Sequence, residues 1–97
     1  MEKQVTVVAR FKAKPGKEEM LKKELVELLE PSRADEGCIN YDLHQGIEDP
    51  GLFIFYENWQ SRELLKKHSV NPHLVAFRER VKDILAEAPE ITLLEML

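Results

Sequence analysis

The sequence predicts an α+β protein whose segments follow one another in the order strand, helix, strand, strand, helix, strand. Each half is a strand followed by an amphipathic helix, which is the split βαβ pattern of the ferredoxin-like fold with a four-stranded antiparallel sheet. Two helices cover only one face of such a sheet, yet three of the predicted strands carry apolar residues on both faces. We therefore expect an identical chain to cover the second face in an isologous homodimer. A monomer with a partly apolar open face is the alternative.

The first half begins with a strand over residues 5–13, whose odd-numbered residues form one apolar face. The Pro-Gly pair at 15–16 ends this strand, because proline lacks a backbone donor and glycine permits a turn. A helix is expected from Lys17, and Pro31 predicts its end or a kink, with Gly37 as the final stop. The apolar residues of this helix form one stripe at helical spacing: Leu21, Leu25, Leu28 and Leu29.

The centre of the chain predicts a β-hairpin. Residues 38–45 alternate between apolar and polar side chains, with Ile39, Tyr41 and Leu43 on one face. A turn follows at Asp49-Pro50-Gly51, and residues 52–59 (LFIFYENW) then begin with an unbroken apolar run. Such a run is typical of a strand covered on both faces, so this strand is expected near the centre of the sheet. Because it ends in polar residues and the only tryptophan, we expect a site at that end.

The second half predicts two helical segments and a final strand. Ser61 is a good N-cap for a short helix that ends at His68. Asn71-Pro72 restarts a helix that is expected to continue as far as Pro89. Its buried stripe is Leu74, Phe77, Val81, Ile84 and Leu85. Residues 90–97 predict the last strand, with Ile91 and Leu93 on one face and Thr92, Leu94 and Met96 on the other.

Composition limits the broad class of the protein. Residues 1–97 are enough for a single domain, and the net charge of −4 provides no basic patch for nucleic acid. The single cysteine, Cys38, cannot form an internal disulfide, and residues 1–4 carry no apolar stretch typical of a signal peptide. No apolar run approaches the roughly 18 residues that cross a bilayer. We therefore expect a cytoplasmic protein that binds neither nucleic acid nor membrane.

Common cofactor and nucleophile motifs are absent from the sequence. His68 and His73 are five residues apart across the predicted helix break, and neither has another histidine or a carboxylate at zinc-like spacing. We therefore expect no metal site. The four glycines lie at turns or at the ends of elements, so no phosphate-binding loop is predicted. No Gly-x-Ser-x-Gly elbow occurs either.

Aromatic and imidazole side chains are the remaining candidates for a site. Trp59 is the strongest, because its indole offers a flat stacking surface and one hydrogen-bond donor. His68 and His73 flank the helix break, where a neutral imidazole facing a cavity accepts a proton near neutral pH. Solvated loop positions are the alternative for both histidines, and packing is the alternative for the others. The whole group is expected near one end of the sheet: Tyr41, His44, Phe55, Tyr56, Trp59, His68, His73 and Phe77.

Five segments together resemble a known family. They are residues 7–17 (VVARFKAKPGK), 30–34 (EPSRA), 37–45 (GCINYDLHQ), 55–59 (FYENW) and 68–73 (HSVNPH). Their combination, which runs from Val5 to about Phe77, is similar to the antibiotic biosynthesis monooxygenase (ABM) domain family, in particular its bacterial quinol monooxygenase-like members. The resemblance implies a dimeric α+β barrel, in which two ferredoxin-like chains pair through their sheets. That expectation agrees with the dimer inferred from the apolar strands.

The resemblance also implies a reaction, the oxygenation of quinol-like or phenolic aromatics by O2 without metal or flavin. A deprotonated phenol reduces O2 itself, so the protein need only deprotonate it, orient it and exclude water. Trp59 and His68 match family positions and are expected as the catalytic pair. The alternatives are an isomerase or processing enzyme for a small oxygenated signal metabolite, and a non-catalytic dimeric ligand-binding module. Further substrate-binding candidates are Tyr41, His44, Tyr56, Asn58, His73 and Arg10.

Overall fold

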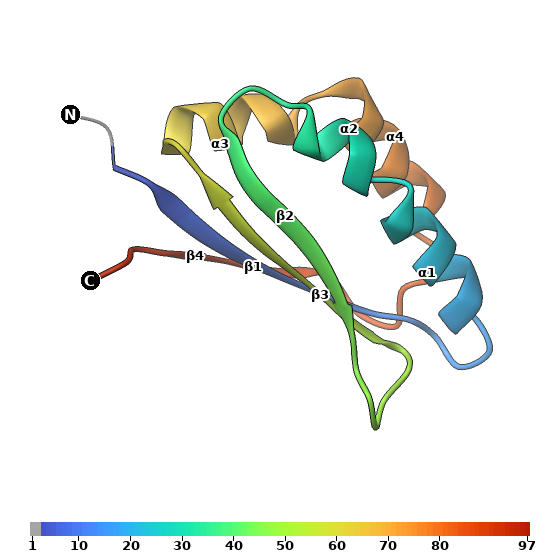
Figure 1. Ribbon diagram of the computed structural model, residues 1–97. Coiled ribbons are helices and arrows are strands. Elements are labelled where there is room, and N and C mark those ends of the chain that lie inside the picture. Colours follow the sequence, from blue (N-terminus) through green and yellow to red (C-terminus); the bar gives the residue numbers. More distant parts are fainter. Residues whose placement is uncertain (1–2) are drawn as a thin grey trace.

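The computed structural model describes residues 3–97 and contains four strands and four helices (Figure 1). The strands pair antiparallel in the order β2-β3-β1-β4, which confirms the ferredoxin-like α+β fold and places β3 inside the sheet. Residues 1 and 2, part of the stretch expected to carry no signal peptide, lie outside the described residues. The elements are β1 (Val5–Lys12), α1 (Glu18–Val26), α2 (Leu29–Arg33), β2 (Cys38–Gln45), β3 (Leu52–Trp59), α3 (Arg62–Ser69), α4 (Pro72–Arg80) and β4 (Glu90–Leu94).

All four helices lie on one face of the sheet, as Figure 1 shows. The antiparallel register puts alternate residues of β1 and β3 side by side on that face, with Val7 opposite Glu57 and Ala9 opposite Phe55. Val7, Ala9 and Phe55 are almost completely buried under the helices. The predicted apolar face of the first strand is therefore confirmed, because alternate strand residues point to the same side of the sheet.

Pro31 reshapes the first helix. The helix that was expected from residue 17 is split into α1 and α2 by a turn at residues 27–28. Because Pro31 has no amide hydrogen, it fits in the first turn of α2 but not in the middle of a continuous helix. Leu21, Leu25 and Leu28 of the leucine stripe are nevertheless buried as predicted, while Leu29 is partly buried. Gly37 follows α2 with a φ of 86°. At that position an added Cβ would lie 2.5 Å from Leu64 Cδ1.

A bulge in β2 corrects one prediction for the second strand. Cys38 lies opposite Trp59 and Asn40 opposite Asn58, so Ile39 is an extra residue between these pairs. Ile39 is half exposed instead of buried. The extra residue shifts the alternation by one position, so that Cys38 and Tyr41 both pack toward the helices.

In the last third of the chain, α3 and α4 begin where the sequence predicted, but α4 is shorter than predicted. Ser61 caps α3 by accepting a hydrogen bond from the Leu64 amide, 3.2 Å away. α4 ends at Arg80, whereas the sequence predicted a helix as far as Pro89. The chain leaves the helix because its backbone pairs with the end of β1: the Ala86 amide donates to the Lys12 carbonyl at 2.8 Å.

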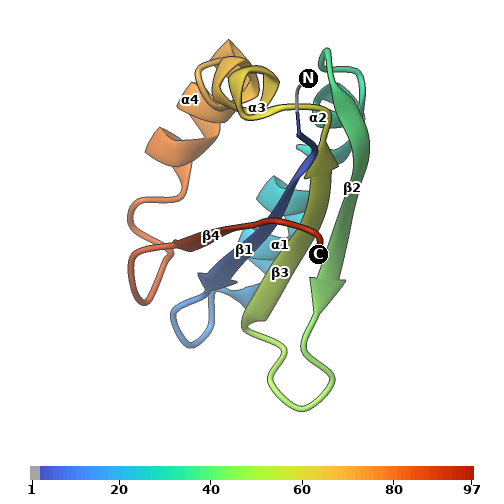
Figure 2. The same cartoon turned by 90° about the vertical axis from the view of Figure 1, so that its left-hand side faces the viewer.

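Residues 3–97 place no helix on the second face of the sheet, as the view in Figure 2 shows. Tyr56 and Leu94 on this face are 43% and 46% exposed. Beside them runs a polar row across three strands, in which Asn58 accepts from Thr6 Oγ1 at 2.5 Å and donates to Asn40 Oδ1 at 2.9 Å. Among the described residues, no helix combines the length and the apolar character that a membrane span needs.

Candidate active site

A cavity of about 700 Å³ lies between the helical face of the sheet and the second half of the chain. It is bounded by β1 and β3 on one side and by α3, α4 and residues 81–91 on the other. Its walls are mostly apolar, and charged side chains of residues 78, 82 and 87 stand at its exposed edge. The apolar walls are formed mainly by Ala9, Phe11, Phe55, Leu74, Phe77 and Leu85.

Glu57 is the one carboxyl group that β3 places in the wall of this cavity. Its side chain is buried, and Oε1 accepts a hydrogen bond from Trp59 Nε1 at 2.9 Å. Burial disfavours the charged carboxylate and raises the pKa of Glu57 to about 7, although the hydrogen bond from Trp59 acts in the opposite direction. The cavity therefore contains a carboxyl group that gains and loses its proton near neutral pH.

Glu57 was missed as a candidate in the sequence, although a signal was present. The core-facing positions of β3 are Phe53, Phe55, Glu57 and Trp59, so a carboxyl group interrupts an otherwise aromatic row. Carboxyl groups are almost never fully buried without a partner or a function. An acidic residue at a core-facing strand position is therefore a usable signal once the strand has been recognised.

Trp59 does not line the cavity, which corrects the expectation that its indole stacks on an aromatic ligand. The side chain is completely buried, and its ring centroid lies 4.3 Å from that of His68. His68 thus covers part of the indole, while the indole N–H is already donated to Glu57. Trp59 supports the two groups that border the cavity and has no exposed surface to offer a substrate.

His68 lies in the last turn of α3 and borders the cavity. Its Nδ1 is 2.6 Å from Asp35 Oδ2. Burial lowers the pKa of His68, and the nearby Asp35 carboxylate partly offsets this effect. The neutral ring is therefore favoured, and the tautomer that suits Asp35 carries its proton on Nδ1. That tautomer leaves a lone pair on Nε2 as a hydrogen-bond acceptor.

Tyr41 is a further polar group in the cavity wall. Its ring packs between Phe55 and His68, with centroid separations of 4.5 Å and 5.6 Å. Burial raises the pKa of Tyr41 above its usual range, so the phenol keeps its proton at neutral pH. Tyr41 can therefore donate a hydrogen bond but is a poor base.

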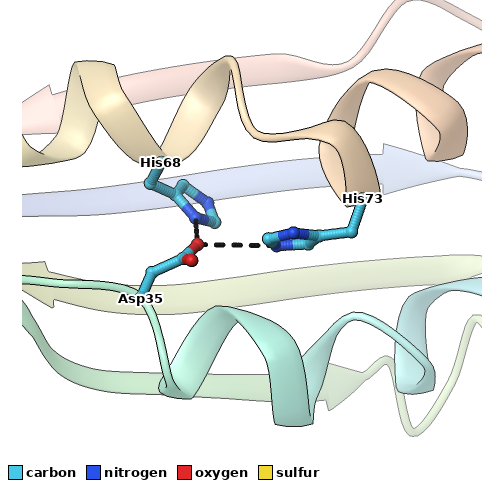
Figure 3. A group of neighbouring side chains, drawn as sticks. All are labelled: Asp35, His68 and His73. Atoms are coloured by element: carbon cyan, nitrogen blue, oxygen red, sulfur yellow. Dashed lines mark hydrogen bonds and ion pairs between the residues drawn. The ribbon is translucent and has the colours of Figure 1, made fainter.

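Asp35 and His73 lie beside His68 and are not part of the cavity wall (Figure 3). Asp35 lies between α2 and β2, and its Oδ1 accepts a hydrogen bond from Asn71 Nδ2 at 2.8 Å. His73 Nε2 is 3.5 Å from Asp35 Oδ2 and 3.4 Å from Ser32 Oγ. The metal argument from the sequence overlooked Asp35, because this carboxylate is 33 residues from His68 and only the fold brings the two together.

Four of the expected site residues lie on the opposite face of the sheet. In the strand register, Tyr56 and Asn58 alternate with the cavity residues of β3, and Arg10 alternates with those of β1. His44 pairs with Ile54 on the same open face. These four side chains therefore point away from the cavity, since a change of parity reverses the side of a strand. Tyr41, His68 and His73 do lie together.

Comparisons with known proteins agree with this architecture. A family model described as antibiotic biosynthesis monooxygenase matches residues 4–80. "Putative monooxygenase Rv0793" of Mycobacterium tuberculosis is 33% identical, and the match covers 93% of this chain and 88% of that protein. "Putative monooxygenase YcnE" of Bacillus subtilis is 28% identical, with 95% and 97% covered.

Solved structures lead to the same conclusion. The crystal structure of PA3566 from Pseudomonas aeruginosa has a TM-score of 0.93 and 36% sequence identity, with 100% of this chain and 97% of that chain covered. The structure of Rv0793 from Mycobacterium tuberculosis has a TM-score of 0.91 at 32% identity, with 97% and 95% covered. The chain is therefore a member of the antibiotic biosynthesis monooxygenase family.

Proposed function

We propose that this protein is a cofactor-independent monooxygenase that oxidises quinol-like or phenolic aromatic small molecules with O2 as co-substrate. The single observation that supports the proposal most strongly is the position of Glu57, a buried carboxyl group in the wall of an apolar cavity. The monooxygenase names of two relatives support the general type of reaction. The choice of substrate rests on the cavity and on its polar groups.

The cavity suits a small aromatic molecule. Its volume of about 700 Å³ is within the range of roughly 300–1,000 Å³ that is typical of small-ligand sites. Phe55 and Phe77 present aromatic surface in its walls, where offset or edge contacts with a substrate ring are favourable. Tyr41 offers a donor and His68 an acceptor for the substrate's oxygen atoms. This combination favours a flat apolar molecule that carries hydroxyl groups.

Glu57 is the proposed base. A phenolic hydroxyl has a pKa of about 10 in water, and an ordinary solvated glutamate of pKa about 4.3 removes its proton poorly. Burial raises the pKa of Glu57 to about 7, which strengthens it as a base and still leaves it ionised in much of the protein at neutral pH. The catalytic roles proposed earlier for Trp59 and His68 therefore change: Trp59 positions Glu57, and His68 contacts the substrate.

The proposed reaction needs no external reductant. Once Glu57 has taken the proton, the phenolate passes electrons to O2 and a carbon–oxygen bond forms at the ring. One oxygen atom stays on the ring as the quinol becomes a hydroxyquinone, and the other leaves as water. The substrate supplies all of the electrons. The protein contributes a base, an oriented substrate and a cavity with few polar groups that compete for the phenolate.

A second copy of the chain is the proposed partner for the open face of the sheet. Val8, Ile54, Tyr56 and Leu94 provide apolar surface there, and a domain of this size gains stability from further burial. Light scattering after size exclusion should give twice the mass of the chain. Ile54→Arg should shift the protein to a monomer, whereas Ile47→Arg in the fully exposed β2–β3 loop should not. A wild-type monomer at micromolar concentration would contradict the dimer.

Oxygen uptake with menadiol tests the proposed reaction. Uptake by the wild-type protein, after subtraction of the blank, should exceed that of Glu57→Gln by at least about a hundredfold, the usual contribution of a general base. Glu48→Gln is the matched control, because Glu48 is exposed in the β2–β3 loop. If a panel of quinols reacts no faster than the blank, the non-catalytic binding module is favoured. Conversion of a substrate without O2 uptake would favour an isomerase.

A further inference from the structure

Three side chains with metal-ligating atoms meet where the loop after α2 approaches the junction of α3 and α4 (Figure 3). They are Asp35, His68 and His73, and one ligand atom of each lies within 4.8 Å of the other two. We propose that these three residues bind one Zn²⁺ ion, with a water molecule as the fourth ligand. The site shares His68 with the proposed function, which assigns no role to a metal. Zn²⁺ on Nδ1 would leave the His68 proton on Nε2, so that His68 would then donate to a substrate oxygen instead of accepting from a substrate hydroxyl.

The spacing of the three groups is close to that of a zinc site. Ligand atoms at about 2.0–2.2 Å from a tetrahedral Zn²⁺ ion are separated from one another by about 3.3 Å. Asp35 Oδ2 is 3.5 Å from His73 Nε2, which already matches, and 2.6 Å from His68 Nδ1. The contact between Asp35 Oδ2 and His68 Nδ1 must therefore lengthen by about 0.7 Å. The separation between the ligand atoms of the two histidines, which is at most 4.8 Å, must shorten by at most about 1.5 Å. The partly exposed side chains of Asp35 and His73 are the ones that would have to rotate to make these changes.

The surroundings hold the ligands in place without saturating them. Asn71 binds Asp35 Oδ1 and leaves Oδ2 directed at the two imidazoles. The ring of His68 is packed against Trp59. Within residues 3–97, the polar neighbours of His73 Nε2 are Ser32 Oγ at 3.4 Å and Asp35 Oδ2 at 3.5 Å, both at the long limit of hydrogen bonding. The His73 lone pair is therefore available to a metal at little cost.

The donor set favours a transition metal such as Zn²⁺ over Ca²⁺ and Mg²⁺. Two imidazoles and one carboxylate suit a transition metal, whereas Ca²⁺ and Mg²⁺ prefer sites with more oxygen ligands. The side chains of Asp35 and His73 are 15% and 24% exposed, which provides a route from solvent and room for a bound water. A bound ion would join the loop before β2 to the start of α4. It would also hold the ring of His68 at the edge of the cavity.

Calorimetric titration of the untagged protein with ZnCl2 at pH 7.5 tests the site. One Zn²⁺ should bind per chain, and His73→Ala should weaken the binding by at least about a hundredfold, since substitutions of outer-shell residues alone cost 10–100-fold. His44→Ala is the matched control, because His44 is the only other histidine and lies exposed on the open face. Cys38→Ala controls for binding by the single thiol.

Two further measurements keep the result independent of the proposed function. Substitution with Co²⁺ should give the strong visible absorption of a tetrahedral site in the wild type and not in His73→Ala. At a free Zn²⁺ concentration of about 100 Kd, the Tm should rise by about 10 °C, because the ion binds only the folded chain. Melting in EDTA shows whether His73→Ala folds. Equal affinity of wild type and His73→Ala, or a wild-type Kd above about 0.1 mM, would overturn the proposal.

Discussion

The replacement of Glu57 by glutamine should make the protein more stable at alkaline pH. The amide keeps a carbonyl oxygen that accepts from Trp59 Nε1, so the 2.9 Å hydrogen bond is retained. What the substitution removes is the charge, which burial makes costly at this position. Stability and activity should therefore change in opposite directions, because the same carboxylate is the proposed base.

The magnitude follows from the shift in pKa. The pKa of Glu57 is raised from 4.5 to about 7, and each unit corresponds to about 1.4 kcal/mol. Between these two values the folded chain binds more protons than the unfolded chain, so stability falls as the pH rises through this window. Below pH 4.5 both states are protonated and the penalty is absent. Above pH 7 wild type should be less stable than Glu57→Gln by about 3 kcal/mol.

Urea denaturation at a series of pH values from 4 to 8 measures this difference. The fluorescence of Trp59, the only tryptophan, reports unfolding, and one protein concentration is used throughout in case the chain is dimeric. Subtraction of the Glu57→Gln curve from the wild-type curve removes the contributions of the other titrating groups. Glu48→Gln should follow wild type at every pH. A difference that changes by less than about 1 kcal/mol between pH 4 and pH 8 would refute a desolvated carboxyl group at Glu57.

Three further outcomes are expected. O2 uptake with a quinol should rise with pH to a plateau with a midpoint near 7, since Glu57 must be ionised to act as a base; a flat profile between pH 6 and 8 would exclude it as the base. Trp59→Phe removes the N–H that stabilises the carboxylate, so the pKa of Glu57 and the midpoint of the pH–rate profile should both move upward; an unchanged midpoint would count against this hydrogen bond. Gly37→Ala should be more destabilising in urea than Gly16→Ala, because both glycines have φ near 85° but only at Gly37 would the new Cβ clash, 2.5 Å from Leu64 Cδ1; equal losses would refute the clash.

Local sequence signals predicted most of the elements because their causes are local. The turn residues at 49–51 and the apolar runs around them led to the bounds 38–45 and 52–59 that the structure shows. Ser61 caps α3 as predicted, because its hydroxyl reaches an amide only three residues ahead. The bulge at Ile39 and the early end of α4 had no local signal, since each depends on pairing with a strand elsewhere in the sheet.

The site was harder to predict than the fold, because it depends on which face of a strand each side chain occupies and on contacts between residues that are far apart in the sequence. Tyr56 and Glu57 are neighbours in the chain, yet the pleat places Tyr56 on the open face and Glu57 in the wall of the cavity. Asp35 reaches His68 only because the loop after α2 and the α3–α4 junction face each other in the fold (Figure 3). Trp59 was chosen for its chemistry, but its complete burial is a property of packing.

The sequence by itself determined the order of strands and helices, because alternation, caps and turn residues act within a few positions of the chain. It also carried the resemblance that the comparisons confirm as membership of the antibiotic biosynthesis monooxygenase family. Only the tertiary structure decided which polar groups are withdrawn from water. The packing raises the pKa of the Glu57 carboxyl group and brings Asp35 to two histidines, because desolvation and long-range proximity arise only when distant segments pack together.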